Sequence, residues 1–313
     1  MFLVDSGNIF FQYGKKAKPQ SRSAILTAEG IAEANVLMGL DAMTVSTLDL
    51  QGGNSFFLRE KIAALPIVSA NTLRRDGTAP FPPWILKQSG EISLAFIGIS
   101  GGSLEHVKDF TLSPPMPALE KSLAELKGKA PFIVLLSTLT SKENSTIARE
   151  HPEIQVIISC ILMRGNLVRL PAPGTLVAQT TSDLASLGEL EISWRPDASK
   201  GWREIHPVAR EELERSLTAG TEKIARMENL IAGATEKKRR RLTHRIGKQR
   251  RLNTLLKAKI DYSLESNDLV QKGEVSTFIS HFHKVYPKPG MQSVFNIVNN
   301  LGKQLKELQL GTQ

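Results

Sequence analysis

The sequence predicts an α/β protein that carries a helical hairpin toward its C-terminal end, and three observations lead to this prediction. Residues 1 to about 195 alternate short, β-rich apolar runs with helical stretches, as in a sheet layered with helices. Beyond them, apolar residues recur every three or four positions, as on a helix that packs along one face. Eleven cations and no acid then lie between Lys237 and Lys259.

In the first part of the chain, nine short apolar runs are predicted as strands and four longer stretches as helices. The strands are Leu3–Val4, Met43–Val45, Ile67–Val68, Ile92–Ile99, Phe132–Leu136, Gln155–Ile158, Leu167–Leu170, Thr175–Gln179 and Leu190–Trp194. The helices are Ala24–Met38, Phe56–Leu65, Ala118–Leu126 and Lys142–Arg149. Several of the strands are apolar on both faces, which is typical of a sheet covered on both sides.

The last third of the chain divides into a linker (196–208), a basic helical hairpin (209–260) and a C-terminal segment (261–313) that ends in a helix. The first hairpin helix carries the apolar seam Leu213, Leu217, Gly220, Ile224, Met227 and Ile231, and the second carries Leu242, Ile246, Leu252, Leu256 and Ile260. Gly233 marks the turn between them. Ile260–Leu264 and Val275–His283 are expected to be extended. The final helix, Gly290–Leu308, is expected to turn Val294, Ile297, Val298, Leu301, Leu305 and Leu308 inward.

Composition limits the class of protein. An apolar content of 41% in 313 residues suffices for one large domain with an appendage. No apolar run is long enough to span a bilayer, and no signal peptide is visible in the chain as given, so it is interpreted literally as cytoplasmic. The single cysteine, Cys160, excludes an intramolecular disulfide, and its apolar surroundings favour a buried, inert thiol.

Six segments, in this order and spacing, resemble successive core segments of the 5′-nucleotidase/UDP-sugar hydrolase branch of the calcineurin-like metallophosphoesterases. They are Phe2–Asn8, Ala42–Val45, Pro66–Asn71, Ala95–Ser100, Val134–Ser137 and Val156–Ser159. The resemblance implies an α/β/β/α sandwich over residues 1–195 that lacks the family's first strand. We therefore expect that another segment fills the gap or that the natural gene product extends upstream. Relatives of this type are exported, so the resemblance also implies a periplasmic location, with a cytoplasmic one as the alternative.

The resemblance also implies a chemistry whose residues are replaced in this chain. Such enzymes use two divalent ions, which need hard carboxylate and imidazole ligands. Gly7-Asn8 stands where the family has Gly-Asp, and Ser46-Thr47-Leu48-Asp49 where it has Gly-Asn-His-Glu. Ser137-Thr138 replaces Ser-His, and Cys160-Ile161-Leu162-Met163 replaces Gly-His-x-His. The remnant positions are Asp5, Asn8, Asp49 and Thr138.

These replacements predict a pseudoenzyme with no metal ion, no cofactor and no catalytic residue, whose role is binding or scaffolding. The alternative is a metal-dependent phosphoester (nucleotide) hydrolase with a noncanonical set of ligands for divalent metal ions. Under that alternative Asp5 and Asp49 are ligands or general acid/base groups. Otherwise they accept hydrogen bonds from turn amides at the strand ends.

The histidines do not restore a metal site, because they are scattered along the chain at positions 106, 151, 206, 244, 281 and 283. His281 and His283 would share one face of a strand, as a pair of metal ligands does. With no carboxylate or third histidine nearby in the sequence, we interpret them as part of a surface strand.

The basic run holds the net charge of the chain. Without its eleven cations the chain has 29 basic and 31 acidic residues, so the overall +9 belongs to this segment. One hypothesis is polyanion binding, to nucleic acid or anionic lipid, although the run has no aromatic residues for base stacking. Another is docking of an unknown acidic protein partner, and a third is a solvated face that glutamates of the preceding helix partly offset. The polyanion-binding candidates are Lys237, Lys238, Arg239, Arg240, Arg241, Arg245, Lys248, Arg250 and Arg251.

Overall fold

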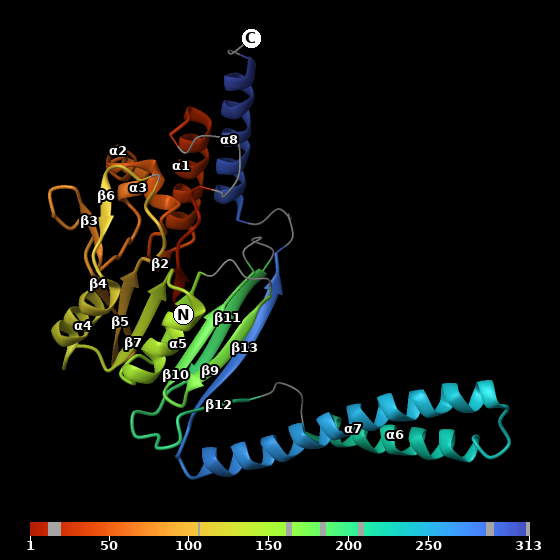
Figure 1. The fold of residues 1–313 in the computed structure, drawn as a ribbon. Coiled ribbons are helices and arrows are strands. Elements are labelled where there is room, and N and C mark those ends of the chain that lie inside the picture. The colour runs from red at the N-terminus through yellow and green to blue at the C-terminus, as the bar shows by residue number, and fades with distance from the viewer. Residues whose placement is uncertain are drawn as a thin grey trace. The chain divides into compact units, whose positions relative to one another are not determined.

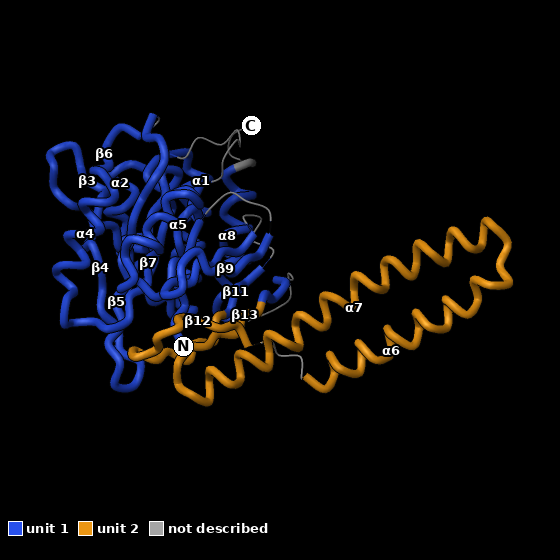
Figure 2. Tube along the Cα trace, turned by 60° about the horizontal axis from the view of Figure 1, so that its bottom comes forward, with its two compact units in different colours: residues 1–189, 282–313 blue, residues 190–281 orange. Residues whose placement is uncertain are grey.

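The structure, a computed structural model, describes residues 1–11, 20–105, 107–160, 165–181, 186–205, 210–285 and 291–310. The chain forms two compact units (Figure 2). Unit 1 contains residues 1–189 and 282–313, and unit 2 contains residues 190–281. Among the described residues, no helix is long and apolar enough to cross a membrane.

Unit 1 is built on a six-stranded sheet in the order β4-β5-β7-β8-β10-β9. These strands are β4 (Trp84–Ser89), β5 (Ile92–Ile99), β7 (Phe132–Ser137), β8 (Val156–Ser159), β9 (Leu167–Ala172) and β10 (Thr175–Gln179). The four central strands run parallel, and β4 and β9 pair antiparallel at the two edges. Every residue of β7 is buried, as expected for a central strand covered on both faces.

Four layers make up this unit (Figure 1). On one face of the sheet, α4 (Pro115–Leu126) and α5 (Ser141–Glu150) form an apolar core with β5, β7 and β8. The other face meets the parallel pair β1 (Leu3–Asp5) and β2 (Leu40–Met43), where the Phe2 and Phe96 rings lie 5.6 Å apart, centroid to centroid. Helix α1 (Arg22–Leu37) covers β2, and α8 (Gln292–Leu310) packs on α1. The predicted α/β/β/α layering is confirmed.

Short elements complete unit 1. They are η1 (Asp49–Gly52), α2 (Asn54–Phe57), α3 (Glu60–Ala63), β3 (Thr72–Arg74) and β6 (Phe110–Leu112). Five aromatic rings hold them together through edge-on and tilted contacts with centroid separations of 5.1 to 6.4 Å; they belong to Phe10, Phe11, Phe56, Phe57 and Phe110. This cluster fixes the segment that follows β1.

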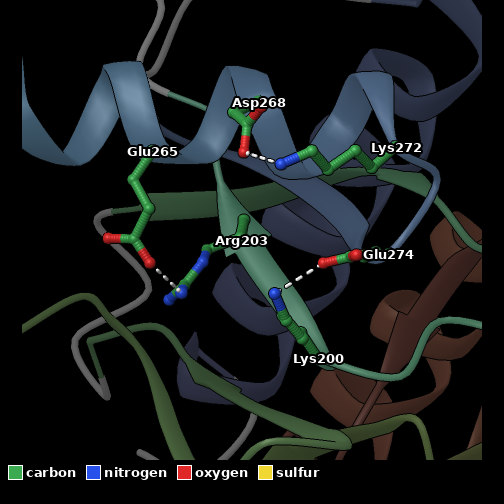
Figure 3. A network of polar contacts seen from close by, with 6 residues as sticks. All are labelled: Lys200, Arg203, Glu265, Asp268, Lys272 and Glu274. Atoms are coloured by element: carbon green, nitrogen blue, oxygen red, sulfur yellow. Dashed lines mark hydrogen bonds and ion pairs between the residues drawn. The ribbon is translucent and has the colours of Figure 1, made fainter.

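Unit 2 contains a helical hairpin and β12 (Trp202–Glu204). The strands β11 (Ser186–Ser193) and β13 (Ser276–Lys284) form a sheet with β12 in the order β11-β13-β12. The hairpin consists of α6 (Arg210–Asn229) and α7 (Glu236–Gln271). Ion pairs lie around the C-terminal end of α7 (Figure 3), where Arg203 contacts Glu265 at 2.9 Å and Lys272 contacts Asp268 at 2.6 Å.

The two hairpin helices meet along the seam that the sequence predicts. Met227 of α6 is buried against Leu242 and Ile246 of α7. Farther along the seam, Gly220 of α6 faces Asn253 and Gln249 so closely that a Cβ atom at Gly220 would collide with both side chains. A side chain at this position would therefore force Asn253 and Gln249 to move.

Several predictions of secondary structure are wrong. Ile260–Leu264 is not extended, because α7 continues through it to Gln271 and buries Leu269 in its last turn. β12 lies inside the stretch predicted as a linker, and the helix predicted at 56–65 is two short helices. Val298 is 58% exposed instead of inward, although Ile297 beside it is buried.

Candidate functional site

The loops that follow β1, β2, β5, β7 and β8 enclose a pocket at the carboxyl ends of these strands. Its volume is about 420 Å³, within the usual range for small-ligand sites. Seven of its thirteen described lining residues carry a hydroxyl or amide group, although most of the lining surface is apolar; they include Asn8, Ser46, Thr47, Gln51, Thr138 and Thr140. Among the described lining residues Glu105 is the one acid, and none is Lys, Arg or His.

The turn after β1 brings Asn8 to the pocket wall. Gly7 has φ +95° and Asn8 has φ +75°, a left-handed conformation that asparagine tolerates better than most residues. A side chain at Gly7 would press on the backbone of Thr44 and Ser46, at 3.2 and 3.1 Å. This left-handed turn places a neutral amide at the position that the resemblance assigns to a bridging carboxylate.

Asp49 is a buried hydrogen-bond acceptor that joins the first two loops. Its Oδ2 accepts from the Asn8 amide at 2.6 Å and from the Ser46 amide and hydroxyl at 2.9 and 2.8 Å. Its Oδ1 accepts from the Phe10 amide at 3.0 Å. Burial raises the pKa of Asp49, and the hydrogen bonds from Ser46, Phe10 and Asn8 oppose this rise.

Asp5 lies near Asp49 and accepts one hydrogen bond, from the Gly7 amide at 2.6 Å. Burial raises its pKa to about 7; the Gly7 hydrogen bond lowers it and the charge of Asp49 raises it further. The Cys160 thiol donates to the Gly7 carbonyl at 3.2 Å, and burial together with the two nearby carboxylates raises its pKa to about 12. Cys160 is half-buried and lines the pocket, so the expected full burial is not found, although a raised pKa agrees with an inert thiol.

Two buried asparagines hold the loops of the pocket, and sequence reasoning missed both roles. Asn71 donates to the Ser100 carbonyl at 2.8 Å and accepts from the Ser100 amide at 2.9 Å, which fixes the loop after β5. Asn144 of α5 accepts from the Ser137 hydroxyl at 2.7 Å and donates to the Leu139 carbonyl at 3.2 Å, which fixes the loop around Thr138. The sequence carried a signal for Asn144, which lies on the apolar face of the helix predicted at 142–149.

The residues of this pocket do not fit the two divalent ions that the resemblance implies. The four acceptor contacts of Asp49 are already made with N–H and O–H donors of the protein. Thr138 accepts from the Gly101 amide at 2.7 Å, and a hydroxyl replaces an imidazole there. Within the described ranges, no three His, Cys, Asp or Glu side chains gather as a metal site. Ile161, Leu162 and Met163 lie outside the described residues.

The histidines are found at separate places. His283 contacts Glu189 at 2.7 Å and His281 contacts Glu191 at 3.7 Å. The carboxylates that the sequence placed far away therefore do reach these histidines, because β11 and β13 pair. His151 lies 3.3 Å from Glu153 beside a second hollow, about 510 Å³, at the start of β7, and His244 is exposed on α7. His106 and His206 lie outside the described residues.

No family model matches the chain. A sequence match joins it to the Bacillus subtilis (strain 168) protein YunD, described as an uncharacterized metallophosphoesterase, with 28% identity over 110 residues. This similarity relates the chain to the metallophosphoesterases. The match covers 32% of this chain and 24% of YunD, so it spans about a quarter of that relative.

Among solved structures, three similar chains illustrate the level of likeness. The Thermus thermophilus sulfate thiohydrolase SoxB has a TM-score of 0.49 and 18% identity, and 61% of this chain covers 35% of that one. For a 5′-nucleotidase precursor from Thermus thermophilus the TM-score is 0.48 at 18% identity, with 62% and 42% covered. The calcineurin-like phosphoesterase YfkN from Bacillus subtilis has a TM-score of 0.47 at 18% identity, with 60% and 70% covered.

Proposed function

We propose that this chain is a non-catalytic binding or scaffolding protein that uses a metallophosphoesterase-like fold. The observation that carries the proposal is the state of Asp49. In a dinuclear hydrolase the carboxylates at the strand ends hold cations, whereas the Asp49 carboxylate accepts from three backbone amides and one hydroxyl. These four hydrogen bonds give the acid at this position a structural role that needs no metal ion.

The pocket itself supports binding rather than phosphoester hydrolysis. Its described lining offers hydroxyl and amide groups and one acid, but no cation to neutralise a phosphoryl group. Neutral donors and acceptors of this kind suit a small, uncharged polar ligand. The Asn8 side chain, which lines the pocket from a fixed turn, is the group we assign to orient such a ligand.

The test is an assay of the full chain with p-nitrophenyl phosphate and nucleotides in Mn²⁺, Zn²⁺ or Mg²⁺. The proposal predicts no turnover above the metal-only blank. Turnover that is lost in Asp5→Ala and kept in Asp76→Ala, an exposed aspartate outside the pocket lining, would contradict the proposal and favour a hydrolase with an unusual ligand set. Activity that survives in both variants would also contradict the proposal, unless a mock purification without the chain shows the same turnover.

A further inference from the structure

The helix α7 carries a continuous cationic face over residues 237–259. All eleven of its Lys and Arg side chains in this range are exposed, and no Asp or Glu lies among them. Two of the eleven form ion pairs, Arg240 with Glu236 at 3.0 Å and Arg250 with Glu228 at 2.7 Å. Within the described residues no ion pair joins the other nine to a carboxylate, so their charge is available to a partner.

The packing of the hairpin determines which cations face outward. The side of α7 that meets α6 carries Leu242, Ile246 and the Asn253 that faces Gly220. At 100° per residue, the opposite side carries Lys237, Arg241, Lys248, Arg251 and Lys259. With a rise of about 1.5 Å per residue, this stripe is about 33 Å long.

Two leucines are exposed within or beside the stripe. Leu255 lies on the outward side and is 63% exposed, and Leu252 next to Arg251 is 49% exposed. The prediction that Leu252 lies in the seam is therefore wrong, and Asn253 faces Gly220 of α6 at this level instead. Clusters of Lys and Arg beside a bilayer are attracted to its anionic lipids, and the two exposed leucines among them can contact the boundary between headgroups and acyl chains.

We propose that the outward face of α7 docks on an anionic phospholipid surface. A flat bilayer surface can contact the straight stripe of cations on α7 along its whole length. The phosphates of a DNA duplex wind once around the axis in about 34 Å, so a straight helix follows them over only part of the stripe. The stripe also offers no aromatic side chain for bases, and the sugar-phosphate backbone gives Leu252 and Leu255 nothing apolar to contact. This docking surface does not depend on whether the pocket of unit 1 binds metal.

The test is co-sedimentation of the full chain with vesicles of phosphatidylcholine alone and of phosphatidylcholine with about one part in three of phosphatidylglycerol. We expect binding to the anionic vesicles only, and a steep loss as salt rises from about 50 to 200 mM. Each juxtamembrane cation strengthens such binding about fivefold, so Arg241→Glu, Lys248→Glu and Arg251→Glu together are expected to weaken it at least a hundredfold, as an order of magnitude. Neutral Gln substitutions at the same three residues, expected to weaken it less, serve if the Glu variant loses helix by circular dichroism.

The matched control carries the same change of charge on the other helix, in Arg215→Glu, Lys223→Glu and Arg226→Glu, which are exposed on α6. We expect this variant to bind clearly better than the α7 variant. Leu252→Ser with Leu255→Ser is expected to weaken vesicle binding about tenfold and to leave binding to a short DNA duplex unchanged. Equal losses in the α6 and α7 variants, no preference for anionic vesicles, or tighter binding to the duplex than to the vesicles would overturn the proposal.

Discussion

Replacing Asp49 with alanine tests whether this carboxylate is a structural acceptor. The substitution leaves the amides of Asn8, Phe10 and Ser46 without their partner. An unsatisfied buried N–H costs about 1 to 3 kcal/mol, and Asn8 can turn to water because it is half-buried. Alanine also removes the cost of burying the charged carboxylate, the same burial that raises the pKa of Asp49, and this offsets part of the loss. We expect the free energy of unfolding of unit 1 to fall by about 2 to 4 kcal/mol.

Asp49→Asn sharpens the test, because an amide keeps one oxygen. In its better orientation this oxygen takes the place of Oδ2 and keeps the contacts with Asn8 and Ser46, while the NH₂ group faces the Phe10 amide. The expected loss is therefore about half that of the alanine variant. Asp76→Ala is the control: its exposed carboxylate accepts from the amide and hydroxyl of Thr78, and we expect no change in the unfolding of unit 1.

Hydrogen exchange measured by mass spectrometry during guanidinium unfolding reports unit 1 separately from the hairpin, which matters because two units need not unfold together. In Asp49→Ala the peptides that contain residues 8–11 and 44–50 should exchange faster than in the native protein, and unit 1 should unfold at lower denaturant. If both peptides keep their protection and the stability changes by less than about 0.5 kcal/mol, the structural assignment of Asp49 is wrong.

Three further predictions concern single residues. Because the pKa of Asp5 is raised, its protonated form stabilises the folded state fully below the unfolded pKa of 3.8, and this contribution is lost as pH rises through about 7. Asp5→Asn should remove this pH dependence of stability. Above pH 7 it should raise the free energy of unfolding by about 1 to 2 kcal/mol, a value reduced because the side chain is partly exposed, and pH-dependent unfolding curves would show it. Cys160, with a pKa of about 12, should resist Ellman's reagent at about pH 8 until guanidinium unfolds the chain, and rapid native labelling would refute its assigned environment. Gly247→Ala, which has open space around it on α7, should stabilise the hairpin by up to about 1 kcal/mol, whereas Gly220→Ala should stabilise it less or destabilise it, because Asn253 and Gln249 must move. Thermal melts in which both glycines behave alike would contradict the packing of the seam.

The sequence was sufficient for the central strands of unit 1 because they are continuous apolar runs, whereas the four layers were predicted from the family resemblance. β5, β7, β8 and β10 are buried on both faces, and a run of this kind can be recognised without knowing its neighbours. The edge strand β4 has an exposed half and therefore lacks that signal. α7 was ended too early because Ile260 and Tyr262 are weak helix formers, whereas packing at Leu269 keeps the helix going.

The strand-end positions of the remnant residues follow from the sequence, but their contacts do not. Asp5, Asn8, Asp49 and Thr138 follow β1, β2 and β7 on the carboxyl side or end them. That the Asp49 carboxylate accepts from the Asn8 and Phe10 amides depends on a turn geometry with no local signature. The pairing of His283 with Glu189 was missed for a similar reason, since the two residues are 94 positions apart and only the pairing of their strands joins them.

The metal stoichiometry of the pocket tests the central claim most directly. The measurement is equilibrium binding of Mn²⁺ to the purified full chain at neutral pH, since Mn²⁺ prefers the hard oxygen ligands that a dinuclear site requires. The account predicts no pair of tightly bound ions, and the same weak isotherm for the native protein, Asp5→Ala and Asp49→Ala. Two ions bound tightly per chain, with both lost in Asp49→Ala and kept in Asp76→Ala, would show that Asp49 is a metal ligand and would contradict the account.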